Sequence, residues 1–267
     1  MRSRATAVVV MVALTAAVLL AAGCDMPSTG GLGQIGGSGN VVTRSYDYSG
    51  FTKVVVDGGF EVRIDQGDAY VVQVRVDDNL VKDHLKVELD GDTLHIGLAP
   101  LWRYHDITTT AQVTMPRLTG LEASGGSDVV LAAFSSGGPL QVEASGSSRI
   151  EIDGAAFGRV GVDVSGASRL EGRAQMEGLA GAVSGGSRLE LAGSATRLRL
   201  DASGGSELLL LELTAESAVL SLSGGSAGEV TATGALTVDA SGGSRLEYAG
   251  SPQVTANTSG GAEVKPY

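Results

Sequence analysis

The sequence predicts an all-β fold: a right-handed parallel β-helix, a solenoid with about 18–21 residues per rung, and an irregular N-terminal β cap. The first observation is a tetrapeptide, Ser-Gly-x-Ser, which occurs eight times from Ser124 to Ala262, with Ala as the last residue of the final copy. Its copies start 21, 20, 19, 19, 20, 18 and 18 residues apart. This period is too short for a propeller blade or a helical repeat and is typical of a β-solenoid.

The second observation is the alternation of residues around each tetrapeptide. Before it, small or branched apolar residues alternate with polar ones, as in Val160, Val162 and Val164. After it, an aliphatic residue lies between charged ones, as in Arg169-Leu170-Glu171. Both patterns predict strands with one buried face. Each rung is therefore expected to be a strand, a glycine corner, a second strand and a looser return through Gly, Ala and Ser.

A single rung is not expected to fold alone. Each inward side chain contributes at most about 1.5–3 kcal/mol, while ordering each residue costs roughly 1.5 kcal/mol. Stacked rungs share hydrogen bonds and a continuous core, so the repeats from 121 to 267 are expected to fold as one cooperative column. The general rule for crossover connections makes that column right-handed.

Residues 1–24 have the features of a signal peptide. Arg2 and Arg4 precede an apolar run from 5 to 22, and the segment closes on Leu20-Ala21-Ala22-Gly23-Cys24. This arrangement resembles the lipobox of bacterial lipoproteins, although the leucine lies four residues before the cysteine and not three. The resemblance implies that Cys24, the only cysteine, is lipidated and attaches the protein to a membrane. A plain transmembrane anchor is the alternative, because the apolar run is just long enough to span.

The next two segments connect this anchor to the column. Residues 25–40 are rich in Gly and Ser and are expected to form a flexible tether. They include a match to the dinucleotide-binding pattern at 31–36, but no predicted strand precedes it and no helix follows, so no cofactor is expected. Residues 41–120 alternate less regularly and are expected to begin and cap the column.

The charge of the chain excludes one class of partner. Without the two arginines of the signal segment, it carries 17 basic and 30 acidic side chains, a net charge of about −13. Binding of nucleic acid depends on basic patches that contact phosphates, so nucleic acid is not an expected partner.

The loop that contains Trp102, Arg103 and Tyr104 is the candidate ligand contact. It holds the only tryptophan of a chain with few aromatic residues, and it combines stacking rings with an arginine. Sugar rings stack on such side chains, which suggests a glycan ligand. The alternative is that Trp102 packs over the first rung as part of the cap.

Two further kinds of site can be considered. His84, His95 and His105 would form a metal site if they met in space, but their spacing matches no known ligand pattern, so no metal is predicted. Many β-helices cleave polysaccharides with paired carboxylates carried beside long loops. The rungs here differ in length by only three residues, which leaves no room for such loops, so no catalytic residues are predicted.

Charged residues recur at fixed places in the rungs and form files along the column. Arginines follow the corners directly, and glutamates come two residues later. A third, acidic file precedes the corners. These files either bind cations or an extended polymer, or simply keep the outer face polar while adjacent Arg and Glu files offset each other's repulsion. The members are Arg149, Arg169, Arg188 and Arg245; Glu151, Glu171, Glu190, Glu229 and Glu247; and Glu143, Asp163, Asp201 and Asp239.

Several motifs together resemble a known family. They are Gly37-Ser38-Gly39-Asn40, Ser49-Gly50-Phe51-Thr52-Lys53-Val54, Asn79-Leu80, Met115-Pro116-x-Leu118 and the Ser-Gly-x-Ser corners. The combination, over about residues 41–250, resembles the auto-transporter adhesin head domain, also called the head GIN domain. The resemblance implies a right-handed β-helix in a bacterial envelope protein and provides no catalytic residues.

The sequence therefore predicts a lipid-anchored envelope protein whose non-catalytic β-helix presents a binding surface for a cell-wall glycan or a protein. The domain would lie outside the cytoplasm, in the periplasm or on the cell surface. The alternatives are a carbohydrate-active β-helix enzyme and a purely structural spacer. The ligand and end-to-end self-association of columns are left open by the sequence.

Overall fold

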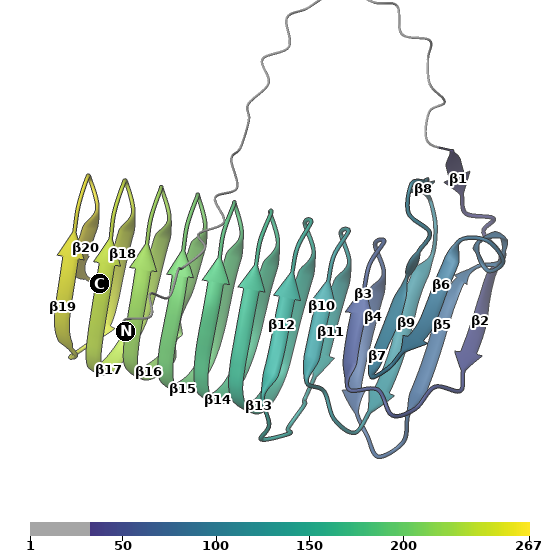
Figure 1. The fold of residues 1–267 in the computed structure, drawn as a ribbon, viewed down its shortest axis with the longest axis horizontal. Coiled ribbons are helices and arrows are strands. Elements are labelled where there is room, and N and C mark those ends of the chain that lie inside the picture. Colours follow the sequence, from purple (N-terminus) through teal and green to yellow (C-terminus); the bar gives the residue numbers. More distant parts are fainter. Residues whose placement is uncertain (1–32) are drawn as a thin grey trace, which may run out of the picture.

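The computed structural model describes residues 33–267, and most of them lie in stacked parallel strands that form a β-solenoid (Figure 1). One continuous sheet holds eighteen strands, and β1 (Gln34–Gly36) and β8 (Arg103–His105) form a separate parallel pair. The predicted all-β solenoid is confirmed. A single short 3-10 helix, Asp78–Leu80, is the only helix among the described residues.

The regular rungs are each formed by one long strand that bends around the column. In β14 (Arg169–Val183) and β15 (Arg188–Ala202) the register is continuous from Arg169 opposite Arg188 to Val183 opposite Ala202, with a gap only at Glu177. The return of the rung therefore stays within the ladder, whereas the sequence suggested a looser segment. Small residues allow this, because glycines such as Gly193, at φ 117°, bend the strand without leaving it. The other strands of this part are β12 (Leu140–Ala144), β13 (Arg149–Val164), β16 (Glu207–Leu222), β17 (Ala227–Ala240), β18 (Arg245–Gly250), β19 (Gln253–Thr258) and β20 (Glu263–Pro266).

The column begins earlier than the first Ser-Gly-x-Ser corner. Strands β3 (Lys53–Val56) and β4 (Glu61–Gln66) stack in parallel on β10 (Gly120–Ala123) and β11 (Asp128–Ala132). The turn Asp57-Gly58-Gly59 between β3 and β4 thus occupies the place of a corner. The irregular segment of the sequence contains a regular rung.

A further rung lies outside this one, although it comes later in the chain. Strand β7 (Thr93–Leu98) pairs in parallel with β3, and β9 (Thr109–Met115) pairs in parallel with β4. The connection between β7 and β9, residues 99–108, therefore takes the position of a corner and is much longer than the others. This enlarged corner carries Trp102.

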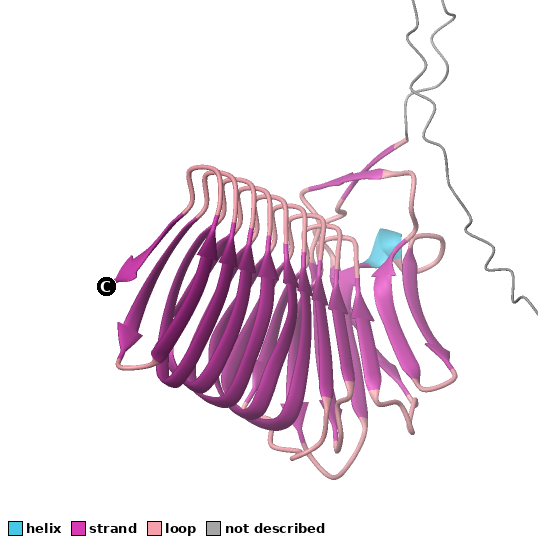
Figure 2. Cartoon of the chain, turned by 60° about the vertical axis from the view of Figure 1, so that its left-hand side comes forward, coloured by secondary structure: helices cyan, strands magenta, loops and turns pink. Residues whose placement is uncertain are grey.

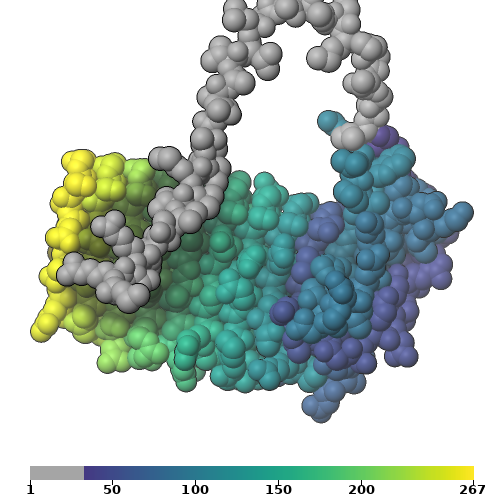
Figure 3. Space-filling model, in the orientation of Figure 1, coloured from purple at the N-terminus to yellow at the C-terminus, as the bar shows by residue number. Residues whose placement is uncertain are grey.

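Antiparallel strands close this end of the column. β2 (Val41–Tyr46) pairs with β5 (Val71–Asp77), β5 pairs with β9, and β6 (Leu85–Asp90) pairs with β7, all in antiparallel orientation. Beneath them Leu94 and Ile96 are fully buried. The cap makes this the wider end of the molecule, drawn in purple and blue in Figure 3.

The corners align along one edge of the column (Figure 2). In each Ser-Gly-x-Ser corner the first glycine has a φ between 61° and 77°, which residues with a Cβ resist. The last serine of the tetrapeptide points inward and is buried in every rung from Ser127 to Ser244. The N–H of Ser127 donates to Oγ of Ser148 at 3.2 Å, and Ser148 donates in the same way to Ser168, so buried serines link successive rungs.

The corner peptides also bond to one another along the edge. The N–H of Gly186, Gly205, Gly225, Gly243 and Gly261 each donates to the first glycine's carbonyl in the preceding corner, over 2.7–2.9 Å. One bond, from Gly126 N–H to the Gly146 carbonyl at 3.1 Å, runs in the opposite direction. The corners are therefore tied together by backbone as well as by side chains.

Candidate functional site

Residues 33–40, which we call the strap, lie across the enlarged corner. β1 of the strap pairs with β8 of that corner, with Ile35 opposite Tyr104. Glycines make the close approach feasible: a Cβ on Gly33 would lie 2.1 Å from the Trp102 ring, and one on Gly36 would lie 2.8 Å from the His105 ring. The expected flexible tether, residues 25–40, therefore differs from the structure over 33–40, and the rest of it lies outside the described residues.

Three consecutive polar residues hold the strap. The Asp77 carboxylate is buried and accepts N–H bonds from Gly39 of the strap and from Thr108 of the enlarged corner, both at 2.7 Å. Asn79 Nδ2 donates to the Gly36 carbonyl at 2.9 Å. Asp77 thus ties the strap and the enlarged corner to the same point of the cap.

Asp78 binds the strap through its exposed carboxylate. Ser38 Oγ donates to Asp78 Oδ1 at 2.6 Å, and Asn40 Nδ2 donates to Oδ2 at 2.7 Å. The Ser38 bond, followed by the Asn40 bond, lowers the pKa of Asp78 below its usual value, because both bonds favour the ionised carboxylate.

The predicted ligand-contact residues have three different environments. Trp102 is 44% exposed, and its ring is nearly perpendicular to the His84 ring, with the two ring centroids 5.0 Å apart. Arg103 is exposed on β8. Tyr104 is half-buried, burial raises the pKa of its phenol, and its hydroxyl donates to the Ala99 carbonyl at 2.8 Å. Trp102 and Arg103 are therefore accessible, whereas Tyr104 serves mainly to fix the loop.

Trp102 borders an open groove of 780 Å³ between the enlarged corner and the next two corners. We call this the cap groove. Leu98, Pro100 and Ile107 supply apolar surface, and Asp57 and Lys86 supply charged groups. The groove combines an exposed indole with hydrogen-bonding groups of both charges, which is the chemistry that a sugar needs.

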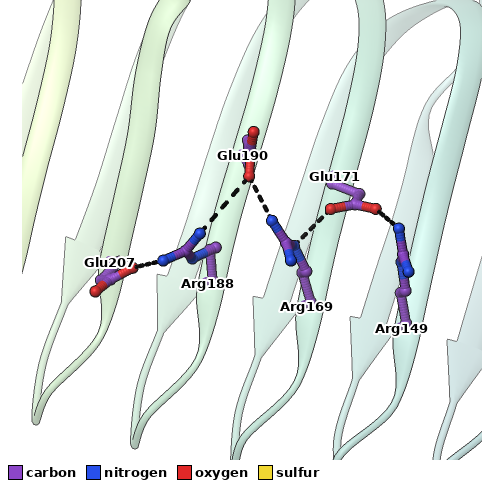
Figure 4. A network of polar contacts seen from close by, with 6 residues as sticks. All are labelled: Arg149, Arg169, Glu171, Arg188, Glu190 and Glu207. Carbon is purple, nitrogen blue, oxygen red and sulfur yellow. Dashed lines mark hydrogen bonds and ion pairs between the residues drawn. The ribbon is translucent and has the colours of Figure 1, made fainter.

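The Arg and Glu files form ion pairs from rung to rung, as Figure 4 shows. Arg169 Nη2 lies 2.7 Å from Glu190 Oε2, and Arg169 also pairs with Glu171 in its own rung. These contacts form an unbroken chain, the charged ladder, and support the interpretation that the two files offset each other's charge. Its members are Arg149, Glu171, Arg169, Glu190, Arg188 and Glu207.

A second groove, of 460 Å³, runs beside the charged ladder. Glu151, Glu212 and Glu229 line it together with Glu171 and Glu190 of the ladder. Arginines contact both oxygens of Glu171 but only Oε2 of Glu190 (Figure 4), so Glu171 alone has no free oxygen from which a general acid would donate its proton. Glu151, Glu171, Glu190 and Glu229 follow the rung repeat, whereas Glu212 lies in an irregular stretch of the register between β15 and β16.

The three histidines lie apart. His84 contacts Trp102 and Tyr104, His105 lies beside Asp106, and His95 is on β7 near Lys53. Within residues 33–267, no group of three His, Cys, Asp or Glu side chains could hold a metal ion. Cys24 lies outside the described residues.

The sequence interpretation missed the strap and its anchors. Gly33 and Gly36 belong to the pattern that resembles a dinucleotide-binding motif, and their actual role is to let the chain approach two aromatic rings. The signal was present in Asp77-Asp78-Asn79, three adjacent hydrogen-bonding residues at the end of a strand. Only the fold shows that they face the segment around residue 38.

These features define the class of the protein: a β-solenoid with a capped end, an accessible aromatic groove beside the cap and polar outer faces. Family comparison adds the particular family. The model described as "Putative auto-transporter adhesin, head GIN domain" matches residues 50–175 and 135–252, so the chain belongs to that family. The predicted resemblance is confirmed.

Solved structures share the fold over most of their length. A crystal structure named as a putative lipid binding protein from Parabacteroides distasonis is 19% identical, with a TM-score of 0.83 over 88% of this chain and 99% of that chain. A putative adhesin from Parabacteroides merdae is 16% identical, with a TM-score of 0.81 over the same shares. No curated protein matches the chain.

The family also bears on the location of the protein. The family's description as a putative auto-transporter adhesin indicates an extracellular or envelope protein. Within the described part of the chain, no helix is long and apolar enough to cross a membrane.

Proposed function

We propose that this protein is a non-catalytic, adhesin-like binding protein of the bacterial envelope, and that it binds a cell-wall or surface glycan in the cap groove. The observation that carries the proposal is the exposed Trp102 indole above that groove. A sugar ring can stack on the indole face while its hydroxyls bond to charged groups such as Asp57 and Lys86. Arg103 is exposed on the same loop but does not line the groove.

The support around Trp102 favours binding over simple packing. The indole is fixed by Gly33 of the strap and by the His84 edge, and the Tyr104 hydroxyl fixes the loop itself. A side chain held in this way loses little conformational entropy when a ligand binds. The solenoid interior, in contrast, is filled with buried side chains, so a ligand must bind on the outer surface.

The glycan proposal is tested by binding of the purified protein to isolated cell-wall and surface-polysaccharide fractions. Wild type should bind one fraction saturably, and Trp102→Ala should reduce affinity by about tenfold or more, since stacking on an aromatic ring contributes on the order of 1–2 kcal/mol. Tyr267→Ala is the matched control, because Tyr267 is an exposed aromatic residue far from the groove. Equal binding by Trp102→Ala and wild type would contradict the proposal.

We further propose that a lipid on Cys24 attaches the protein to the membrane. The apolar segment before Cys24 and the Gly and Ser residues after it support this attachment. A Cys24→Ala variant should shift from the membrane to the aqueous fraction of bacterial cells and should lose the mass of the lipid. A variant that stays fully bound with unchanged electrophoretic mobility would favour a transmembrane anchor.

The non-catalytic assignment is tested separately. The polysaccharide fraction to which the protein binds should be incubated with the protein and assayed for new reducing ends, which glycosidic cleavage would produce. None should appear. If reducing ends appear and are lost in Glu212→Gln or Glu229→Gln, the groove beside the charged ladder is an active site and the assignment is wrong.

A further inference from the structure

The hydrophobic core is covered at one end of the column and exposed at the other. At the capped end, Leu94 and Ile96 are fully buried beneath antiparallel strands. At the other end, the corresponding inward position of β19 is held by Val254, which is 39% exposed, and every residue of β19 is exposed. We call this the open end (β19 and β20, yellow in Figure 1).

The open end also carries unused backbone hydrogen-bonding groups. The N–H groups of Ser259, Glu263 and Tyr267 all bond to the preceding rung. In a parallel ladder, successive residues direct their N–H and C=O to opposite neighbours. The groups of Ala256, Thr258 and Val264 therefore point away from the column, and no residue among 33–267 pairs with them.

The sequence of β20 is complementary to itself when two copies run antiparallel. If Val264 of one chain pairs with Val264 of another, its outward N–H and C=O form two reciprocal hydrogen bonds. Glu263 then lies directly opposite Lys265 of the second copy, and Lys265 opposite its Glu263. Opposite charges at such cross-strand positions each stabilise a sheet by roughly 0.2–1 kcal/mol.

We propose that the open end is an interface with a second copy of this chain, related by a two-fold axis perpendicular to the column. When this axis is also perpendicular to β19 and β20, it reverses strand direction, so β19 meets β19 and β20 meets β20 in antiparallel pairs. The end of the core is covered, and Val254 is buried from both sides. This inference is independent of the glycan proposal.

The association is closed and stops at two copies. The interface is isologous, so each chain uses its open end once. At the capped end, the outer strands β2 and β6 carry Arg44 and Lys86, and charged side chains on edge strands hinder further pairing. The ends of two rungs bury less than a standard interface of about 1,200–2,000 Å². The expected dimer is therefore weak, with a dissociation constant on the order of 100 µM.

Charge exchange provides a specific test. Glu263→Lys places Lys opposite Lys, and Lys265→Glu places Glu opposite Glu, so each variant alone should dimerise at least tenfold more weakly than wild type. A mixture of the two variants restores opposite charges at both positions and should form a heterodimer. Sedimentation velocity of the full chain from about 10 µM to 1 mM, under reducing conditions, measures all three cases.

Backbone pairing is tested by Val264→Pro. The Val264 N–H points outward, so proline removes the intermolecular donor without removing a bond within the column. This variant should be monomeric and should keep the far-UV circular dichroism of the folded column, although the partial packing of Val264 on the core is changed. Wild type that stays monomeric at 1 mM, single charge variants that dimerise as wild type does, or assemblies larger than dimers would each overturn the proposal. Glu263→Lys also removes the ion pair with Arg245 within the chain, and Lys265→Glu removes the one with Glu247. The melting temperatures of these two variants measure those losses separately.

Discussion

At the residue scale, the two glycines of a corner have different roles. In the corner at 203–206, Gly204 has φ +74°, and a Cβ there would lie 2.8 Å from the Gly185 carbonyl oxygen. Gly205 does not have a positive φ, and its added Cβ would be at an ordinary contact distance of 3.7 Å. One rung already carries Ala at the second position, as Ala167. In this corner the first glycine is required by the conformation and the second is not.

This difference predicts opposite effects of two adjacent substitutions. Gly204→Ala should lower the free energy of unfolding by about 2 kcal/mol, because it adds backbone strain of roughly 1–2 kcal/mol and a close contact. Gly205→Ala should be neutral or should raise it by about 0.4–1 kcal/mol, because alanine restricts the unfolded chain. Urea denaturation of both variants measures the effects. Equal destabilisation would show that the whole corner excludes Cβ atoms.

Ser147 is the third residue of its corner, where most corners have their second glycine, and has φ +71°, which is unfavourable for a residue with a Cβ. We predict that Ser147→Gly raises the free energy of unfolding by about 0.5 kcal/mol, because relief of strain outweighs the added entropy of the unfolded chain. The matched control is Ala167→Gly, at the same place in the next corner but without a positive φ. The control should be destabilising by about 0.4–1 kcal/mol. A loss of stability in both variants would contradict the prediction.

At the scale of elements, the strap is the segment that pairs with the loop carrying Trp102. Its attachment depends on pH through Asp78. A carboxylate with a lowered pKa in the folded state stabilises that state above its usual pKa, and the contribution is lost as the pH falls through the lowered value. The strap should therefore loosen under acid conditions while the column remains folded.

The measurement for this prediction is Trp102 fluorescence between pH 7 and pH 3. Release of the strap removes Gly33 from the indole face, so the emission should shift to the red below about pH 4, the usual range of aspartate. In Asp78→Asn, the shift should already be present at pH 7 or should lose its pH dependence. Far-UV circular dichroism controls for unfolding. A wild-type emission identical to that of Asp78→Asn at every pH would contradict the proposed attachment.

The elements also show how far the sequence could predict the structure. The regular rungs, their inward residues and their glycine corners follow from a short period and a local alternation, so they were predictable. The rung formed by β7 and β9 was not predictable. Its alternation of apolar and polar residues predicts strands, but it does not indicate that they stack outside β3 and β4. The strap was missed for the opposite reason, since a Gly- and Ser-rich segment suggests flexibility and its hydrogen-bond partners at 77–79 are distant in sequence.

The candidate site was predictable only in part. A single tryptophan among few aromatic residues indicated the loop at 101–106 as a ligand contact, and Trp102 lies beside a groove. The partners Asp57 and Lys86 could not be foreseen, because they come from a different corner and from a cap strand. The Arg and Glu files were visible in the repeat, but their ion pairs depend on the register between rungs, which only the stacked strands supply.

At the scale of the whole molecule, the column is a stack of nearly equivalent units. Its stability should therefore be close to a sum of contributions from each rung and from the contacts between neighbours. Deleting residues 184–202 removes one full rung and joins Val183 to the corner at 203, where the sequence of a normal rung continues.

We predict that this deletion leaves a folded protein with a single cooperative transition and a melting temperature lower by only a few degrees. Deleting residues 188–197, about half a rung, should instead disrupt the fold, because it places the remaining strand out of register. Thermal unfolding followed by circular dichroism distinguishes the two. If both deletions unfolded the protein equally, the rungs would not be interchangeable units.

The bonds between corner peptides have an electrostatic consequence for the whole column. From Gly166 to Gly261 the corner peptides are joined head to tail in one direction, as the peptides of an α-helix are, so their individual dipoles add. Because the bond from Gly126 to Gly146 runs the other way, the positive ends of the two runs meet between the corners at 145–148 and 165–168. Even without the charged side chains, the edge of corners therefore has a positive region between these two corners and negative ends at Gly125 and Gly260.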